Sequence, residues 1–198
     1  MQRSAVVSRR DPDEAMIDGC RNGDPEAMRA LWLEYKDRVY SIALHFFRDD
    51  QAVAQDITQD VFIKLFARLQ QFRHESGFTT WLYRLVANAC MDEQRRRNRW
   101  SVFGDAVADL AIERAPSPDV PVDELFVRTE IADEVKVAVA SLTPKLRIVI
   151  LLRYFDDLAY EEMAAALECS PGTVASRLNR AHQSLARKLG HFRGSVMS

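Results

Sequence analysis

Residues 160–181 read YEEMAAALECSPGTVASRLNRA, and this stretch is the most specific structural signal in the chain. Its apolar spacing predicts two short helices separated by a turn at residues 168–170. Ser170 can cap the second helix, because its hydroxyl can accept a hydrogen bond from an unpaired backbone N–H and Pro171 suits the first helical position. Ala164 is small enough to let the two crossing helices approach closely. The stretch is therefore typical of a helix-turn-helix.

The outer side of the second helix carries side chains that can bond phosphates or base edges in the major groove of DNA. They are Thr173, Ser176, Arg177 and Arg180. Because spacing alone does not assign a function to exposed arginines, an ordinary helical hairpin with solvated side chains stays open as the alternative.

Helical periodicity continues upstream of this motif. Apolar residues keep helical spacing over residues 125–141 and again over residues 144–155. The pattern breaks at Thr143-Pro144 and again at Asp156-Asp157. We therefore expect a second helical domain over residues 125–192, with the helix-turn-helix at its end.

The first hundred residues show the same kind of pattern. Asp11-Pro12 and Asp24-Pro25 each place a capping carboxylate before a proline, so each pair predicts the start of a helix. Further helices are expected on either side of a break at residues 48–50, and no period-two run predicts a strand. We expect a first helical domain over residues 11–100 and an all-α fold class.

Between residues 101 and 124 the apolar pattern weakens. The segment holds Pro116, Pro118 and Pro121, and residues 105–124 contain six acidic side chains and one basic side chain. Such a composition is typical of a flexible, solvated connection. We therefore expect an acidic linker over residues 101–124 between two small helical domains.

The net charge of −2 conceals an alternation of charged blocks along the chain. Residues 11–60 hold 12 acidic and 5 basic side chains, whereas residues 61–100 hold 3 acidic and 8 basic ones. Residues 171–193 hold five basic side chains and no acidic one. The two basic blocks suit contact with DNA at two separate faces, and the acidic blocks suit a basic partner.

Composition argues against several other classes of protein. No apolar run approaches the roughly 20 residues that span a bilayer, and residues 1–10 lack the apolar core of a signal peptide, so we expect a cytoplasmic protein. Cys20, Cys90 and Cys169 form no CxxC pair, which argues against a disulfide framework and a zinc site. Scattered histidines and the lack of a glycine-rich phosphate loop lead us to expect no enzyme activity, no metal and no cofactor.

Two sets of motifs together resemble the extracytoplasmic-function group of the bacterial sigma-70 family. Residues 170–181 are similar to the family's region 4, and residues 56–65 resemble its region 2.2. Regions 2.3 to 2.4 are matched by Trp81-Leu82, Asn88, Asp92 and Arg95. The resemblance implies a sigma factor that binds the beta-prime and beta subunits of core RNA polymerase and directs promoter recognition, melting and transcription initiation. It also implies that an anti-sigma factor can be a further partner.

The resemblance implies roles for individual residues as well. Those matching the segment that docks on a coiled coil of the beta-prime subunit are Asp56, Gln59, Asp60, Phe62 and Lys64. Those that would lie along the minus-ten strand are Asn88, Arg95, Arg96 and Arg99, with the loop at residues 72–77 helping to hold an extruded base. Those that would read the minus-thirty-five element are Thr173, Ser176, Arg177 and Arg180. We expect Trp81 to pack in the core. For the docking face and the arginine run, a merely solvated helix surface stays open.

Three positions depart from the family pattern. Ala175 and His182 stand where relatives often carry lysine and arginine, so phosphate contacts should depend more on Arg177 and Arg180. Ala159 replaces a usual serine cap, which should cost about 1 kcal/mol of local helix stability. The alternative for the whole chain is a helix-turn-helix regulator that acts without polymerase, but it leaves the first domain unexplained.

Overall fold

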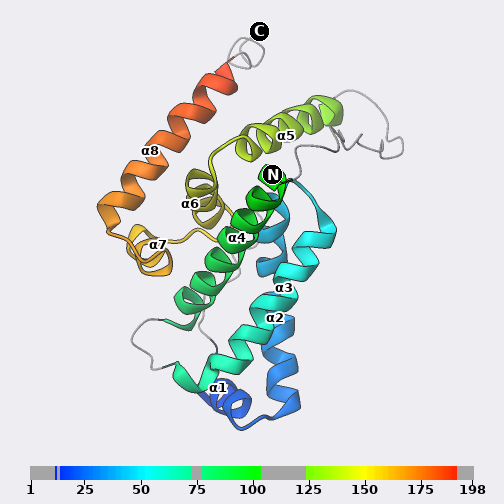
Figure 1. Ribbon diagram of the computed structural model, residues 1–198, viewed down its shortest axis with the longest axis vertical. Coiled ribbons are helices and arrows are strands. Elements are labelled where there is room, and N and C mark those ends of the chain that lie inside the picture. The colour runs from blue at the N-terminus through cyan, green and yellow to red at the C-terminus, as the bar shows by residue number, and fades with distance from the viewer. Residues whose placement is uncertain (1–11, 13, 73–76, 104–123, 191–198) are drawn as a thin grey trace.

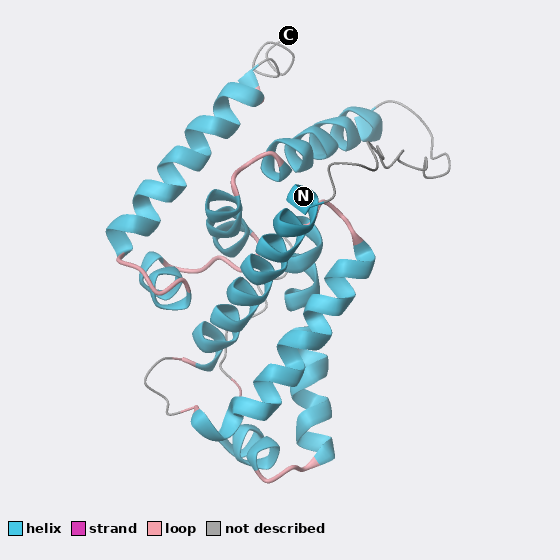
Figure 2. Ribbon diagram, viewed as in Figure 1, coloured by secondary structure: helices cyan, strands magenta, loops and turns pink. Residues whose placement is uncertain are grey.

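Eight α-helices and one short 3-10 helix make up the computed structural model over the residues that it describes, which are 12, 14–72, 77–103 and 124–190 (Figure 1). Side chains are described over the same ranges except at residues 101–103 and 124–131. No strand occurs within these ranges (Figure 2). The expected all-α fold class is confirmed.

The N-terminal region contains four α-helices and the 3-10 helix. Their bounds are Glu14–Arg21 for α1, Pro25–Phe46 for α2, Gln51–Arg68 for α3, Leu69–Gln71 for the 3-10 helix and Phe78–Phe103 for α4. Asp24 caps α2 as predicted, since its Oδ1 accepts a hydrogen bond from the Glu26 N–H at 3.0 Å. Gly23, between α1 and α2, has a φ of 76°, a left-handed conformation that glycine adopts without steric cost. Asp11, the other predicted cap, lies outside the described residues.

The C-terminal region contains the other four helices. Their bounds are Glu124–Ala140 for α5, Pro144–Tyr154 for α6, Tyr160–Ala166 for α7 and Pro171–Lys188 for α8. Ser170 caps α8 as predicted, because the Thr173 N–H donates to the Ser170 Oγ at 3.1 Å. Residues 167–170 form the turn of the predicted helix-turn-helix. Most of the expected linker, residues 104–123, lies outside the described residues.

Helix α4 is buried on nearly all sides over its first half. Three consecutive residues, Trp81, Leu82 and Tyr83, are each at most 7% exposed, and Val86 and Ala87 one turn later are at most 2% exposed. Consecutive helical positions point about 100° apart, so such a run cannot face a single neighbour. Figure 1 shows the reason: α4 runs between α2 and α3 on one side and α6 and α7 on the other.

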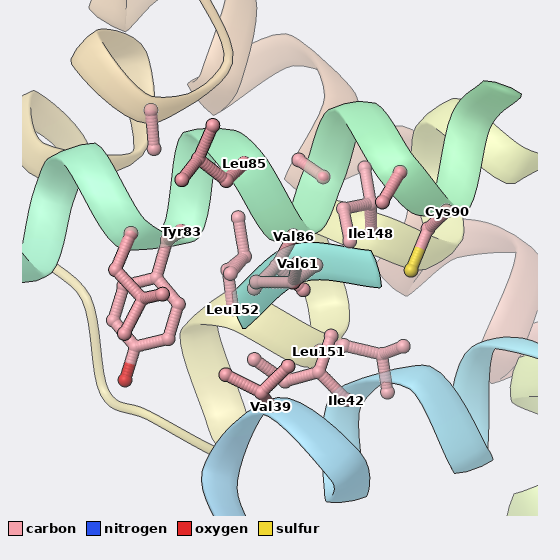
Figure 3. Close-up of a cluster of buried hydrophobic side chains, with 14 of the residues drawn as sticks. Val39, Ile42, Val61, Tyr83, Leu85, Val86, Cys90, Ile148, Leu151 and Leu152 are labelled. Atoms are coloured by element: carbon pink, nitrogen blue, oxygen red, sulfur yellow. The ribbon is translucent and has the colours of Figure 1, made fainter. Parts of the chain in front are cut away.

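One apolar core joins the two regions (Figure 3). Helix α6 contributes five residues to this core, and three of them, Ile148, Leu151 and Leu152, are labelled in Figure 3 and at most 2% exposed. They lie beside residues of the N-terminal region, namely Val39 and Ile42 of α2, Val61 of α3 and Val86 of α4. The sequence predicts two helical domains joined by a linker, and in the structure these two regions pack directly against each other.

Candidate functional site

Helix α8 has one apolar side and one polar side. The apolar side packs on α6 and α7 through Val174, Leu178 and Ala181. The four residues expected to face DNA lie elsewhere on the helix: Ser176 and Arg180 are exposed, and Thr173 and Arg177 are half-buried. The structure thus brings these four residues together on the N-terminal half of α8, next to the turn.

Local hydrogen bonds fix the side chains at this end of α8. The Thr173 Oγ1 lies 2.9 Å from the Ser170 Oγ, and the Ser176 hydroxyl donates to the Thr173 carbonyl at 3.0 Å. The Arg177 Nη1 donates to the Cys169 Sγ at 3.8 Å, so this guanidinium lies along the turn.

The second half of α4 forms the other basic surface. Its residues expected to lie along the minus-ten strand are all exposed: Asn88, Arg95, Arg96 and Arg99. Trp100, which the sequence analysis did not single out, follows them with 73% of its surface exposed. A large aromatic directly after an arginine run is the signal that could have identified it, because such a ring can stack on an unpaired base.

Acidic residues on the same helix hold several of these arginines. Glu93 binds the Nε of Arg96 at 2.7 Å and the Nε of Arg97 at 3.1 Å, and Asp92 binds Arg95 at 2.8 Å. Desolvation acts to raise the pKa of Glu93, but the hydrogen bonds and charges of Arg96 and Arg97 outweigh it, so the pKa is lowered. The carboxylate therefore stays ionised and partly neutralises this surface.

Two expectations near α4 have different outcomes. Trp81 is 7% exposed and its ring lies 5.3 Å from the Phe72 ring and 6.0 Å from the Phe78 ring, which confirms that it packs in the core. Of the loop expected to hold an extruded base, residues 73–76 lie outside the described residues.

Helix α3 carries the expected polymerase-docking residues, and they differ in how far they are exposed. Asp56 and Gln59 are exposed, and Asp60 and Lys64 form an ion pair at 2.6 Å on the surface. Phe62 is only 2% exposed.

The Phe62 ring lies 4.5 Å from the ring of Trp32 in α2, and it therefore packs in the core. Its role in polymerase docking stays a prediction. Two aliphatic side chains on these helices are exposed instead, Ile63 of α3 at 61% and Leu33 of α2 at 53%.

The departures from the family pattern also have local partners. The Nε2 of His182 lies 2.9 Å from the hydroxyl of Tyr154, so this side chain is tied to α6. Ala159 begins α7 without a side-chain cap, but its N–H donates to the Glu162 carboxylate at 2.6 Å. The Glu162 half of a capping box is therefore kept, and what Ala159 lacks is the side-chain oxygen of the usual serine.

Within the described ranges, no helix is long and apolar enough to cross a membrane. The same part of the chain contains no group of three or more histidine, cysteine, aspartate or glutamate side chains arranged to hold a metal ion.

The fold and these surfaces define a helical DNA-binding protein with two regions, one of which carries a helix-turn-helix. Residues 31–100 match the family model described as Sigma-70 region 2, and residues 132–185 match the one described as Sigma-70, region 4. The chain is 32% identical to the RNA polymerase sigma-H factor of Pseudomonas aeruginosa, over 90% of this chain and 94% of that protein. It is 30% identical to the ECF RNA polymerase sigma-E factor of Escherichia coli, over 89% of this chain and 94% of that protein.

The chain belongs to the sigma-70 family, in its extracytoplasmic-function group. It is a sigma factor that acts with core RNA polymerase in promoter recognition.

Two solved structures share this fold. One is the sigma factor RpoE of Bartonella quintana in complex with the anti-sigma factor NepR, with a TM-score of 0.64 and 24% identity over 82% of this chain and 96% of that one. The other is CnrH in complex with the cytosolic domain of CnrY, with a TM-score of 0.65 and 22% identity over 90% and 97%.

Proposed function

We propose that the two regions divide promoter recognition between them. Residues 11–100 bind core polymerase and the minus-ten element, residues 125–192 bind the minus-thirty-five element, and residues 101–124 connect them. The observation that carries this proposal is the N-terminal half of α8, which is capped, exposed and lined by groups that bond DNA. A helix N-terminus of this kind suits both phosphate contact and entry into the major groove.

On α8, Arg180 is the side chain on which we place the largest share of minus-thirty-five binding. It is exposed, whereas Arg177 is half-buried beside Cys169. Ser176 and Thr173 add hydroxyl groups about one and two turns nearer the helix start. A bidentate arginine contact to a guanine contributes about 1–3 kcal/mol of base discrimination.

On α4, the exposed face from Asn88 to Arg99 would follow the minus-ten strand, and Trp100 would stack on an unpaired base there. Promoter melting needs such contacts, because extruding a base costs a few kcal/mol and stacking returns about 1–3 kcal/mol. The ion pair of Arg95 with Asp92 is exposed at both side chains and is therefore weak, so a phosphate would replace it readily. The Glu93 partner of Arg96 is more buried, so that pair would be harder to replace.

On α3, polymerase docking would use Asp56, Gln59, Asp60 and Lys64 for orientation and the exposed aliphatic Ile63 for buried area. A charged rim around an apolar centre is the usual composition of a protein interface. Phe62 supports this surface from below, through its contact with Trp32.

The test is transcription in vitro by core RNA polymerase on a genomic template library, with and without the chain. New start sites that share two upstream motifs would support the proposal, and their absence would overturn it. Arg180→Ala should then reduce initiation at least tenfold, whereas Arg187→Ala, an equal loss of charge in the last turn of the same helix, should leave it within twofold. Gln59→Ala and Gln55→Ala form the corresponding pair on α3.

We also infer that the chain acts in the cytoplasm, where polymerase is, and has no catalytic activity of its own. An anti-sigma factor stays a prediction from the family resemblance. Native co-purification of the tagged chain, followed by mass spectrometry, tests for one.

A further inference from the structure

Helix α4 leaves the apolar core after Cys90. Cys90 is fully buried, whereas no side chain from residue 91 to residue 100 is buried. Beyond the partly buried Met91, the apolar core therefore does not fix the direction of this helix. The residues expected to lie along the minus-ten strand, Arg95, Arg96 and Arg99, are in this part of α4, so their position depends on other contacts.

Arg97 supplies such contacts by connecting this part of α4 to the corner between α2 and α3. Its Nη2 lies 3.0 Å from the Asp50 Oδ2, and its guanidinium carbon lies 5.2 Å from the centre of the Phe47 ring. Its Nε also pairs with Glu93, one turn earlier on α4, at 3.1 Å. The guanidinium thus uses both its hydrogen-bond donors and its flat face.

The corner that receives Arg97 has a constrained backbone. Arg48 and Asp49 have φ values of 60° and 62°, a left-handed conformation that residues with a Cβ adopt only at a steric cost. Such a conformation persists only where the surrounding structure holds it, and here the Asp49 N–H donates to the Leu44 carbonyl at 2.9 Å. Phe47 and Asp50, on either side of these two residues, therefore form a rigid anchor for Arg97.

Asp50 connects the same anchor to α3. Its Oδ1 accepts a hydrogen bond from the Val53 N–H at 3.2 Å and so caps α3, while its Oδ2 binds Arg97. One carboxylate therefore joins the first turn of α3 to the exposed end of α4. Because α3 carries the expected polymerase-docking residues, this carboxylate relates the direction of the docking helix to that of the helix expected to bind DNA.

Arg97 does not share the DNA-facing side of α4. Consecutive positions of a helix point about 100° apart, so Arg97 is about 160° around the helix from both Arg95 and Arg99. Its charge is met by the carboxylates of Asp50 and Glu93. The arginine run therefore contains residues of two kinds, since Arg95 and Arg99 point away from the α2–α3 corner and Arg97 points toward it.

We propose that Arg97 is a positioning residue for promoter melting. By holding α4 against the α2–α3 corner, it sets where Arg95 and Arg99 lie relative to the polymerase-docking surface of α3. The inference rests on the proposed binding of polymerase by α3 and of the minus-ten strand by α4. Arg97 itself contacts neither, and its loss lets the end of α4 move, so that the arginines that bind DNA are placed less accurately.

The distance between spin labels on the two helices tests this role directly. The labels are attached to cysteines introduced at Gln55 of α3 and Arg99 of α4, which are both exposed. Cys169 is replaced by serine in this background, whereas Cys20 and Cys90 are buried and stay. Pulsed electron paramagnetic resonance should give a narrow distribution of distances, because α4 is held at the corner.

Arg97→Gln should broaden or shift this distribution. The matched control is Arg95→Gln, an equal loss of charge two residues earlier, because Arg95 pairs with Asp92 of its own helix. The control should leave the distances unchanged. A distribution that Arg97→Gln does not alter would overturn the proposal.

Promoter binding and initiation by the complete polymerase complex give the second readout. Arg97→Gln should lower initiation about three- to tenfold, the order expected from losing two surface ion pairs and a cation–π contact. It should leave the salt dependence of promoter binding unchanged, whereas Arg95→Gln removes a phosphate contact and should reduce the slope of log affinity against log salt by about one. An equal fall in slope for Arg97→Gln would show that Arg97 binds DNA itself and would overturn the positioning role.

Asp50→Asn tests whether Arg97 acts through Asp50. Asparagine can still cap α3 but lacks the charge that binds Arg97. The double variant Arg97→Gln with Asp50→Asn should initiate as well as Arg97→Gln alone, and effects that multiply would contradict the proposal. Arg97→Lys, whose ammonium can still pair with Asp50, should recover part of the initiation. If the wild-type chain starts no transcription with core polymerase, the proposed function fails instead, and the label distances still report whether Arg97 holds α4.

Discussion

Replacement of Arg147 by leucine should destabilise the folded chain substantially. In the native structure its guanidinium donates to three carbonyls, those of Phe46, Ala140 and Leu142. Burial, followed by repulsion from Arg48, lowers the pKa of Arg147 to about 10, so the side chain stays cationic at pH 7. Leucine fills a similar volume but removes the Arg147 donor from all three carbonyls, of which that of Ala140 keeps a hydrogen bond from Arg48 at 3.3 Å.

The expected magnitude follows from opposing terms. Three hydrogen bonds to a charged group contribute about 1.5–3 kcal/mol each. Removing the charge recovers several kcal/mol of desolvation cost and also relieves the Arg147 Nε, which is buried without a partner. We expect a net loss of about 2–4 kcal/mol in the free energy of unfolding. Arg147→Lys, which keeps the charge but has a single compact ammonium group, should lose about 1–2 kcal/mol.

Urea denaturation followed by circular dichroism measures this difference. Lys145→Leu, an exposed change on the same helix, is the control and should stay within about 0.5 kcal/mol of wild type. The m-value of Arg147→Leu should also fall, because the two regions would no longer unfold as one cooperative unit. A leucine variant as stable as wild type would refute the reasoning, since it would mean that desolvation cancels the three bonds.

Three further predictions concern the cap of α7, the cysteines and Glu93. Ala159→Ser should raise the free energy of unfolding by about 0.5–1 kcal/mol, because a hydroxyl would complete the half capping box formed with Glu162. An unchanged or lower melting temperature would contradict this prediction. Burial raises the pKa of the Cys90 thiol to about 12, and burial together with the charge of Asp24 raises the pKa of Cys20. A thiol reagent at neutral pH should therefore modify the half-buried Cys169 first. Peptide mass spectrometry that finds Cys90 labelled in the native chain would count against this prediction. Glu93→Gln should free Arg96, whereas Arg97 keeps its ion pair with Asp50 at 3.0 Å. The variant should bind promoter DNA more tightly and with a steeper salt dependence. Glu93→Asp keeps the charge as a control, and equal salt slopes for all three proteins would rule the idea out. The pKa of Glu93 in the folded chain lies below its ordinary value of 4.5. The stability from its ion pairs is therefore present above about pH 4.5 and is lost as the pH falls through the folded pKa. Acid titration of the wild-type chain against Glu93→Gln would detect this loss.

Much of the fold was predictable because its determinants are local. Asp24 and Ser170 cap their helices through backbone groups two or three residues away, and the prolines after them fit the first helical position. The exposed faces of α8 and of the second half of α4 were equally predictable, since helical period alone separates an apolar side from a polar one. The burial of Trp81 followed from the same pattern.

For Phe62 the sequence left two positions open, one in the core and one on the docking face. Phe62 lies next to the exposed Ile63 in a stretch of mixed polarity, and both are apolar. Which of the two faces the core depends on where Trp32 of α2 lies, and the sequence of α3 does not contain that information.

The sequence by itself therefore determined the helices, their caps, the helix-turn-helix and the two basic surfaces. Only the tertiary structure decided that the two regions share one core and that α4 is buried between them. The physical reason is range: a helical period indicates that a face is apolar, but not how many neighbours cover it. Arg147 shows this dependence on distant residues most clearly. A buried cation is stable only where hydrogen-bond acceptors lie within reach, and one acceptor of Arg147 is a carbonyl 101 positions earlier in the chain.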